Sequence, residues 1–557
     1  MLVMRQLTTV GVGLALLLMV EQQVTAQTSL PTPQDTQEES LNVVPAVSEM
    51  KAKKEKIAQT TPPTPANPDP AQAEDLLPLS TQKKRVNENA PAPNFLNPSG
   101  NPLIFPTAPS EVDINTVQPL SLNQVVELAL RNNKELQTAR LQLEQRQAQL
   151  AEQRARYYPA LNAQFNFSRD SSTGLAQQNL NTRRRIDRLN SDSNPVNDVT
   201  EQQLRQSLSN KESTNATGQL GLTYNLYTGG ERSAQIQRAE QEIQRQKLVV
   251  EQNSEQVRFQ ATRAYYDLQR SDAEVAIAQA AIEDATQSLR DAQLLEQAGL
   301  GTRFSVLQAE VDVARANQDL TTNISNQRIA RRTLVNLLSL GQKVDVTAAD
   351  PIEEAGNWPL TLEESIVLAY KNRSELEQQL VARDLAEQDR KIVLADIKPK
   401  VDLSANYEYA DNFDDEISVV DGYSFVATAR WNFFDGGRAF ARVRQFDRQK
   451  DIANNEFARL RNQVRLEVEQ AYYSSVANQE NISTAALSVE SATESLRLAR
   501  LRFQAGVGTQ TDVINSQRDL TDARSRYLQA IVDYNISLNE LQRAVSNWPD
   551  GRLFELR

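Results

Sequence analysis

The spacing of apolar residues changes several times along the chain after residue 118. Before Pro159 the apolar residues fall at helical intervals, whereas after Pro159 they alternate with polar residues at every second position. A period of about 3.6 predicts a helix with one apolar face, and a period of two predicts a strand with two different faces. The alternating segments predict strands at about 159–169, 218–228, 399–410 and 423–434.

Two long parts of the chain contain no proline, namely 196–350 and 400–548. An internal proline would cost a helix roughly 3 kcal/mol, so these parts are typical of long helices. We expect long helices at 231–297 and 438–504, followed by return helices at 303–340 and 510–546. Each long helix would span roughly 100 Å, more than three times the ~30 Å hydrocarbon core of a bilayer. Because these helices are also polar, they must extend into an aqueous compartment.

The folded part of the sequence occurs twice. Residues 120–122 recur at 360–362, an offset of 240, and residues 298–302 recur at 505–509, an offset of 207. The offsets differ by 33, so the first copy carries a 33-residue insertion between Phe167 and Gly218. Internal repetition of this kind predicts two structural copies. They cover 118–345 and 360–546, with a linker at 346–359.

Proline and glycine mark the changes between helix and strand in both copies. A proline precedes the first strand of each copy, and a glycine pair follows the second strand. Glycine adopts backbone conformations that other residues avoid, so we interpret these positions as strand–helix hinges. They are Pro159, Gly229, Gly230, Pro399, Gly436 and Gly437.

The N-terminal part of the chain differs from the two copies. Residues 1–26 contain Arg5, an apolar run and a Val-Thr-Ala cleavage motif, which predict a secretory signal peptide. Sixteen of the 22 prolines lie between residues 27 and 120. Such a segment buries too little apolar surface to offset the entropy of ordering it, so we expect 27–117 to be a disordered tether. We expect 547–557 to form a C-terminal tail.

The four predicted strands have the length of tilted strands that cross a bilayer. Their polar faces include Asp402, Glu408 and Arg430, which we interpret as lining a water-filled barrel lumen. For any one strand the alternative is a soluble sheet with one wet face. Aromatic residues gather at the helix-side ends, as at a membrane interface. They are Tyr157, Tyr158, Tyr227, Trp431, Phe433 and Phe434.

Four strands cannot close a barrel, and an open strand edge cannot face lipid. The chain must therefore associate with further copies to close its sheet. Two chains would give eight strands, and three would give twelve strands with room for a pore. The residues themselves leave both arrangements open.

Composition excludes several classes of function. The chain has no cysteine and no histidine, which excludes thiol catalysis, imidazole catalysis and the usual zinc sites. The glycine pairs at 299 and 301 and at 506 and 508 lack the third glycine of a dinucleotide-binding loop. The net charge of −12 argues against a nucleic-acid partner. We expect no enzymatic activity, no metal and no cofactor.

Together these features resemble the TolC-type family of outer-membrane efflux proteins over about 118–545. The resemblance rests on the paired prolines, the Tyr-Thr-Gly-Gly and Phe-Asp-Gly-Gly strand exits, and the two Ala-Gly-x-Gly-Thr turns. It implies a mixed α and β fold in which a homotrimer closes a 12-stranded transmembrane β-barrel, continuous with a long α-helical periplasmic tunnel. It also implies a passive exit duct in the outer membrane for efflux or type I secretion. The implied partners are outer-membrane lipid, a periplasmic membrane-fusion adaptor and an inner-membrane RND or ABC transporter.

The resemblance also implies functional residues at the far ends of the helical hairpins. It places one aperture carboxylate at Asp512, whose first-copy equivalent is Ser305. The nearby charged residues Arg518, Asp519, Asp522 and Arg524 are candidates for closing ion pairs, and the alternative is that these exposed helix charges form a solvated face. The resemblance implies adaptor docking at two tips, although the glycines could serve only to permit the turns. The tip residues are Gly299, Leu300, Gly301, Thr302, Gly506, Val507, Gly508 and Thr509. For the whole chain, the alternative is a periplasmic coiled-coil adaptor or scaffold without a membrane barrel.

Overall fold

The structure is a computed structural model of the chain. It describes residues 90–546 except 99–100, 102, 104, 115, 172, 192–201, 207–211 and 414–418. The chain divides into two units, 1–64 and 65–557, and every described residue belongs to the second. The expected signal peptide at 1–26, the tether up to residue 89 and the tail at 547–557 lie outside the described residues.

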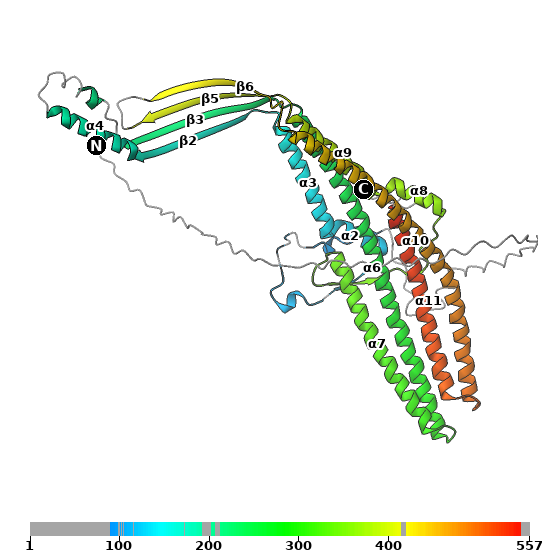
Figure 1. The fold of residues 1–557 in the computed structure, drawn as a ribbon. Helices are drawn as coiled ribbons and strands as arrows, with labels where there is room; N and C mark the ends of the chain where they lie inside the picture. Colours follow the sequence, from blue (N-terminus) through cyan, green and yellow to red (C-terminus); the bar gives the residue numbers. More distant parts are fainter. Residues whose placement is uncertain are drawn as a thin grey trace, which may run out of the picture. The chain divides into compact units, whose positions relative to one another are not determined.

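Four antiparallel strands form one sheet in the order β2-β3-β5-β6 (Figure 1). The first copy contributes β2 (Ala160–Ser171) and β3 (Glu212–Tyr227), and the second contributes β5 (Lys400–Asn412) and β6 (Val420–Arg430). Pairing of β3 with β5 joins the two copies. β3 begins six residues earlier than expected, at Glu212, and β6 ends at Arg430, so that Trp431 and Phe433 follow the strand.

The strand register gathers apolar side chains on one face of this sheet. Leu161, Leu222, Ala405 and Phe425 lie side by side across the four strands in one row. The next row is formed by Ala163, Leu220, Tyr407 and Tyr423. Most of these large side chains are exposed in the single chain. The sheet therefore presents an apolar face that stays largely exposed among the residues that the structure describes.

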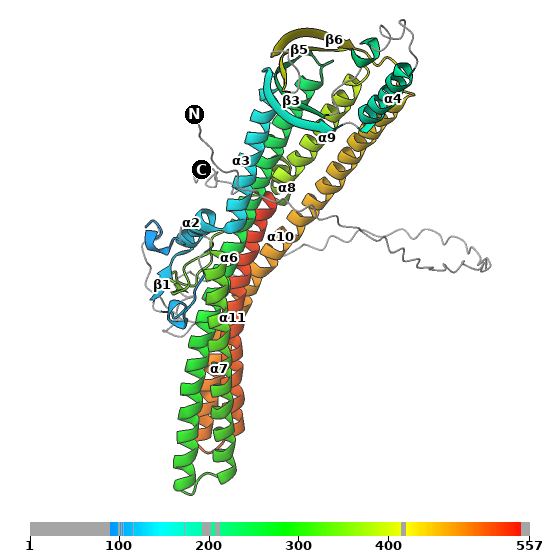
Figure 2. The same ribbon diagram turned by 90° about the vertical axis from the view of Figure 1, so that its left-hand side faces the viewer.

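The helices form two hairpins, one for each copy (Figure 1). In the first copy α6 (Glu231–Gln297) packs against α3 (Lys134–Ala155) and α7 (Arg303–Leu337). In the second copy α10 (Arg438–Gln504) packs against α9 (Ser374–Ala395) and α11 (Gln510–Val545). α6 also contacts α9 and α11, which joins the hairpins along their length (Figure 2). No described helix is long and apolar enough to cross a membrane.

Each hairpin has a core built from equivalent residues of the two copies. Val257, Ala261 and Leu334 are buried in the first copy, and Val464, Val468 and Leu541 occupy the corresponding positions of the second. Small side chains alternate with leucine and valine, which lets neighbouring helices approach closely and exclude water. The duplication seen in the sequence is thus also present in the packing.

The helix expected before each first strand is divided in two. α2 (Leu122–Asn132) and α3 meet at Asn133, and α8 (Leu362–Asn372) and α9 meet at Arg373. Asn133 has an extended ψ of 128° and Arg373 one of 107°. The helical apolar spacing before Pro159 gives no sign of this break, because the same spacing continues across it.

Two segments predicted to lack structure are folded in part. β1 (Thr116–Leu120) pairs in parallel with β4 (Val344–Ala348), which lies at the start of the expected linker. Short 3-10 turns occur at Asn94–Leu96 and Pro109–Glu111. Leu96 is fully buried in the core that includes α2. The disordered tether therefore does not extend to residue 117, because a few apolar side chains dock on a core that the helices already supply.

The 33-residue insertion also contains regular structure. A helix, α4 (Thr173–Asn190), follows β2 in the connection to β3. The equivalent connection of the second copy runs only from the end of β5 at Asn412 to the start of β6 at Val420.

A buried carboxylate fixes the linker between the copies to the first hairpin. Oδ2 of Asp350 accepts hydrogen bonds from the backbone N–H of Leu122 and from the hydroxyl of Tyr265, both at 2.8 Å. The hydroxyl in turn accepts a bond from the backbone N–H of Asp350 at 3.1 Å. This carboxylate therefore caps α2 and holds it against α6.

Tyr265→Phe is expected to destabilise the protein by about 1–3 kcal/mol, because it removes one of the two donors to the Asp350 carboxylate and leaves the backbone N–H of Asp350 without its acceptor. Denaturant titration of the detergent-solubilised protein measures this loss. Tyr266→Phe is the matched control, since Tyr266 is also buried but its hydroxyl has no hydrogen-bond partner among the described residues. Equal losses from the two substitutions would contradict the role assigned to Asp350.

Candidate functional site

The polar face of the sheet carries the charged residues predicted to line a lumen. Arg430 donates from Nη2 to Oδ2 of Asp402 at 2.8 Å, and Gln219 donates to Glu408 at 3.3 Å across the β3–β5 pair. Gly221 lies between Asn162 and Asn406, and a Cβ there would come within 2.9 Å of the Asn162 amide oxygen. Polar side chains thus cover this face closely and bind one another.

The predicted hinge residues lie at the junctions between sheet and helices. Pro159 and Pro399 directly precede β2 and β5. Gly230 and Gly437 are the N-caps of α6 and α10, with φ of 92° and 85°. Residues with a Cβ rarely adopt such angles. Gly229 and Gly436 also have positive φ.

Of the predicted girdle residues, Trp431 donates from its indole nitrogen to the backbone oxygen of Ile397 at 3.1 Å. Tyr157 lies under the guanidinium of Arg232, which is 5.1 Å from the ring centre. Both aromatic residues are therefore held to the junction between strand and helix.

The geometry of the turn accounts for the glycine and threonine residues at the two tips. Gly299 and Gly506 have φ of 72° and 73°. A Cβ at Gly301 would lie 2.9 Å from a backbone nitrogen, and one at Gly508 would lie 3.1 Å from another. Thr302 and Thr509 accept hydrogen bonds from the third residue of the following helix and are its N-caps.

Leu300 and Val507 have no such role in the turn. Their side chains are 81% and 71% exposed, and they lie at the same position of the two tips. A single exposed apolar side chain needs no explanation, but here the same position of both tips carries one. These two residues are therefore the tip positions most informative about docking.

Asp512 stabilises the start of α11. It accepts from the backbone N–H of Thr509 at 2.9 Å, and its own N–H donates to the Thr509 hydroxyl at 3.2 Å. The hydrogen bond from the Thr509 backbone lowers the pKa of this exposed carboxyl group. In the first copy the backbone N–H of Ser305 likewise donates to the Thr302 hydroxyl at 3.2 Å, but the Ser305 hydroxyl bonds with that same hydroxyl, at 2.9 Å, instead of with the Thr302 backbone. The structure thus assigns Asp512 a capping contact that the aperture prediction did not consider.

Arg518 links the two return helices. It donates from Nη2 to Oδ1 of Asp312 on α7 at 2.9 Å, and the Asp312 side chain is 11% exposed. Gln308 and Thr511 form a second link between α7 and α11 at 3.1 Å. Asp519 is exposed and has no polar partner among the described residues. Of the aperture candidates, Arg518 alone bridges the copies in the part of the chain that the structure describes.

The ion pair borders a cavity of about 390 Å³ between α6, α7 and α11. Asp319 and Asp522 also line this cavity, so the guanidinium of Arg518 meets an excess of acidic groups. Asp312 was missed in the sequence because an isolated aspartate on a long polar helix carries no local signal. Its pairing across the copies could be found only from the structure.

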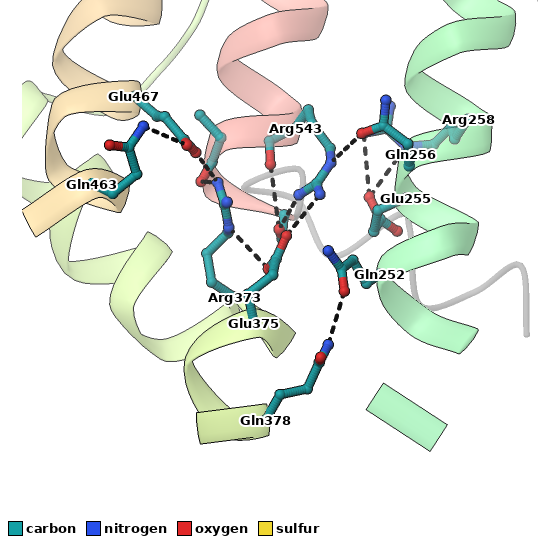
Figure 3. Close-up of polar contacts among 12 residues, drawn as sticks. Gln252, Glu255, Gln256, Arg258, Arg373, Glu375, Gln378, Gln463, Glu467 and Arg543 are labelled. Carbon is teal, nitrogen blue, oxygen red and sulfur yellow. Dashed lines mark hydrogen bonds and ion pairs between the residues drawn. The ribbon is translucent and has the colours of Figure 1, made fainter. Parts of the chain in front are cut away.

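A second polar network lies where α8 meets α9 (Figure 3). Arg373 donates to Glu375 at 3.0 Å, to Glu467 of α10 at 2.8 Å and to the backbone oxygen of Ala544 at 3.2 Å. Arg543 of α11 donates to the other oxygen of Glu375 at 2.7 Å (Figure 3). The side chains of Arg373 and Glu375 are 7% and 12% exposed. The network therefore joins three helices within the second copy.

The first copy places Asn133 at the position of Arg373. Its side chain accepts from the backbone N–H groups of Glu135 and Leu136, which caps α3. It also donates to the backbone oxygen of Leu337 at 3.4 Å, the equivalent of Ala544. The contact to the end of the return helix is thus common to both copies, whereas the second copy replaces the cap with an ion-pair network.

Burial alone would raise the pKa of Glu375, but the guanidinium groups of Arg373 and Arg543 together lower it. A depressed carboxyl pKa stabilises the fold at pH values above about 4.5, the unfolded reference. This contribution is lost as the pH falls through the folded-state pKa. The described residues contain no group of three acidic side chains that could hold a metal ion.

The profile of a family described as "Outer membrane efflux protein" matches residues 125–340 and 365–547. The chain belongs to this family. Members are outer-membrane channels, which places the protein in the cell outer membrane with its helical part in the periplasm. The protein is accordingly an outer-membrane efflux channel, and the alternative of a periplasmic adaptor or scaffold without membrane strands was wrong.

Several characterised proteins resemble this family member. It is 23% identical over 349 residues to the outer membrane efflux protein BepC of Brucella suis biovar 1 (strain 1330), covering 60% of this chain and 74% of that protein. A membrane protein from Pseudomonas aeruginosa has a TM-score of 0.62 at 20% identity, covering 84% of this chain and 99% of that chain. The open state of the Neisseria gonorrhoeae MtrE outer membrane channel has a TM-score of 0.61 at 17% identity, covering 84% and 97%. These structures share the fold of barrel strands joined to a helical tunnel.

Arg373→Asn introduces into the second copy the residue that caps α3 in the first. The new cap would contribute about 1 kcal/mol, but removing one partner of a buried ion pair costs about 3–5 kcal/mol. We expect a net loss of about 2–4 kcal/mol in the free energy of unfolding at pH 7. Denaturant titration followed by circular dichroism measures it.

The pH dependence is the control for this substitution. Protonation of Glu375, as the pH falls below 4.5 and through the lowered pKa of the folded protein, removes the attraction in the wild type too. The difference between the two proteins should therefore shrink as the pH falls. A difference that stays constant from pH 7 to pH 3 would show that packing, not charge, accounts for the loss.

Proposed function

We propose that this channel is a passive exit duct closed by three copies of the chain. The observation that carries the proposal is the four-stranded sheet, which has one exposed apolar face, one polar face and two unpaired edges at β2 and β6. Unpaired backbone groups cannot face lipid. Three chains supply twelve strands, enough for a barrel with a water-filled lumen, and Asp402, Glu408 and Arg430 line it.

We further propose that a periplasmic membrane-fusion adaptor docks at the two tips and connects the duct to an inner-membrane RND or ABC transporter. Leu300 and Val507 support this proposal, since both are exposed and neither is needed for the turn. The flanking glycines and threonines position these two side chains. The duct would contribute no chemical step, in keeping with a family of transport channels.

The aperture of the duct lies near these tips, and the Asp312–Arg518 ion pair holds α11 against α7 in its closed form. Both partners lie on return helices, close to the turns that would bind the adaptor. Movement of α11 away from α7 has to break this contact and the Gln308–Thr511 link. Adaptor binding at the tips is therefore well placed to change the opening.

The combined substitution Leu300→Asp and Val507→Asp is expected to weaken adaptor binding at least tenfold, because it puts charges where apolar anchors would be buried. Export of a known efflux substrate from intact cells should fall accordingly, and crosslinking to the adaptor measures binding directly. The glycines are unsuitable for this test, since substituting them would alter the turn.

The control for the tip variant exchanges the two apolar side chains, Leu300→Val with Val507→Leu, and should retain export. The aspartate variant should still give heat-modifiable trimers with wild-type conductance. Unchanged crosslinking and export in that variant would refute docking at the tips.

The aperture proposal is tested in planar bilayers, where the purified wild-type protein should form discrete conducting channels. Asp312→Asn and Arg518→Gln should each raise the single-channel conductance several-fold, because either change removes the closing ion pair. The charge-swapped protein, Asp312→Arg with Arg518→Asp, is the matched control and should return toward the wild-type value.

Absence of any conductance from correctly assembled wild-type trimers would contradict the proposal that the protein is a conducting duct. Wild-type conductance in both single variants would instead reject only the assignment of Asp312 and Arg518 to the aperture.

A further inference from the structure

The helix α4 gives the first copy a surface that the second copy lacks. It begins shortly after β2 ends at Ser171, in the connection to β3 (Figure 1). The other ends of these strands, at Pro159 and Gly229, lead to the helices. Because the helical part of this family lies in the periplasm, α4 belongs to the opposite, outward side of the membrane.

α4 carries a concentrated positive charge in a chain whose net charge is −12. Its arginine cluster consists of Arg183, Arg184, Arg185 and Arg188, with Asp187 as the single acidic residue of the helix. All four arginines are exposed, and no described residue forms an ion pair or hydrogen bond with their guanidinium groups. By contrast, exposed arginines of α10 such as Arg448 and Arg497 pair with carboxylates three residues away.

Two of the four arginines lie on the side of the helix away from its buried residue, and the other two flank that side. Ile186 is 5% exposed and marks the buried face. At about 100° per residue, Arg184 and Arg188 lie nearly opposite Ile186. Leu180, one turn before Arg184, is exposed beside them. Helices at a lipid interface combine arginine on a polar face with exposed apolar side chains that can enter the headgroup region, and Leu180 supplies such a side chain here.

The membrane surface lies within reach of this face. Phe167 and Phe413 contact each other with ring centres 6.3 Å apart, and they mark the aromatic end of the sheet on this side. From Phe167 to the start of α4 the chain advances about 20 Å if fully extended, and less along the membrane normal because barrel strands are tilted. Long arginine side chains shorten the remaining distance to the lipid headgroups.

We propose that α4 lies on the outer leaflet and that its arginine cluster binds the phosphate groups of the leaflet's lipid A. The guanidinium group donates two parallel hydrogen bonds to a phosphate and remains charged at any physiological pH. Several cations held on one helix face add their attraction to an anionic membrane surface. This surface would anchor the outward end of each subunit in the leaflet, independently of the adaptor at the opposite end.

The test uses the full-length trimer, immobilised in neutral-detergent micelles and titrated with labelled lipid A. We expect the variant with all four arginines changed to glutamine to bind lipid A at least tenfold more weakly. The variant with four lysines should stay within about threefold of the wild type, because the charge is kept. Removal of the lipid A phosphates should weaken binding to the wild type by a similar factor.

A variant that loses the same total charge elsewhere provides the matched control. It carries glutamine at four exposed arginines of α10, each of which pairs with a carboxylate on its own helix, and it should bind lipid A as the wild type does. These arginines are Arg448, Arg459, Arg465 and Arg497. Heat-modifiable trimers and unchanged conductance in the α4 glutamine variant show that the channel itself is intact.

Three outcomes would overturn the proposal. The first is wild-type affinity for lipid A in the glutamine variant, and the second is equal affinity for lipid A without its phosphates. The third is a changed conductance with unchanged lipid binding, which would place α4 at the channel mouth instead. The proposal rests on the outer-membrane location. Lipid binding and conductance are measured separately, so a variant that loses lipid binding but conducts normally shows that the two proposals can fail independently.

Discussion

The hydrocarbon core of a bilayer offers no hydrogen-bond partner to a peptide group, and the rest of the architecture depends on this constraint. In the sheet β2-β3-β5-β6 the inner strands are paired on both sides, whereas β2 and β6 each have one edge without a partner strand. A single chain can therefore fold its strands but cannot place them in lipid. The same sheet already distinguishes its two faces, with aromatic and aliphatic rows on one and hydrogen-bonded polar residues on the other. Association with further copies would thus pair the free strand edges of a sheet whose apolar and polar faces are already distinct in each chain.

The two copies are held together at several levels. β3 pairs with β5 in the sheet, and α6 packs on α9 and α11 below it. Asp350 holds the linker to α6, while Arg518 connects the return helices near their tips. Equivalent core residues keep the two hairpins alike, whereas polar residues at the helix breaks differ. The apolar core is therefore alike in the two copies, whereas the charged contacts differ between them.

Much of this arrangement could be predicted from the sequence because it depends on periodicity and on glycine and proline. The long helices, the strands and the turns all have patterns that extend over ten residues or more, or that occur twice. The break at Asn133 could not be predicted, since apolar spacing continues through it and a single backbone angle changes. The folded part of the proline-rich segment was missed because Leu96 is ordered by a distant core. Asp312 and the Arg373 network were missed for a related reason, as their partners are far away in sequence and leave no local pattern.

The capping residues at the tips have a further consequence for any ring of partners. Three chains would present six tips around the end of the duct, three from each copy. Ser305 is the third residue of the helix after the first tip, and Asp512 is the third residue of the helix after the second. A serine hydroxyl and an aspartate carboxylate would therefore alternate at this position around the ring. A partner that binds at all six positions meets two chemically different environments, so its six copies would form two sets of three, each set related by the threefold axis.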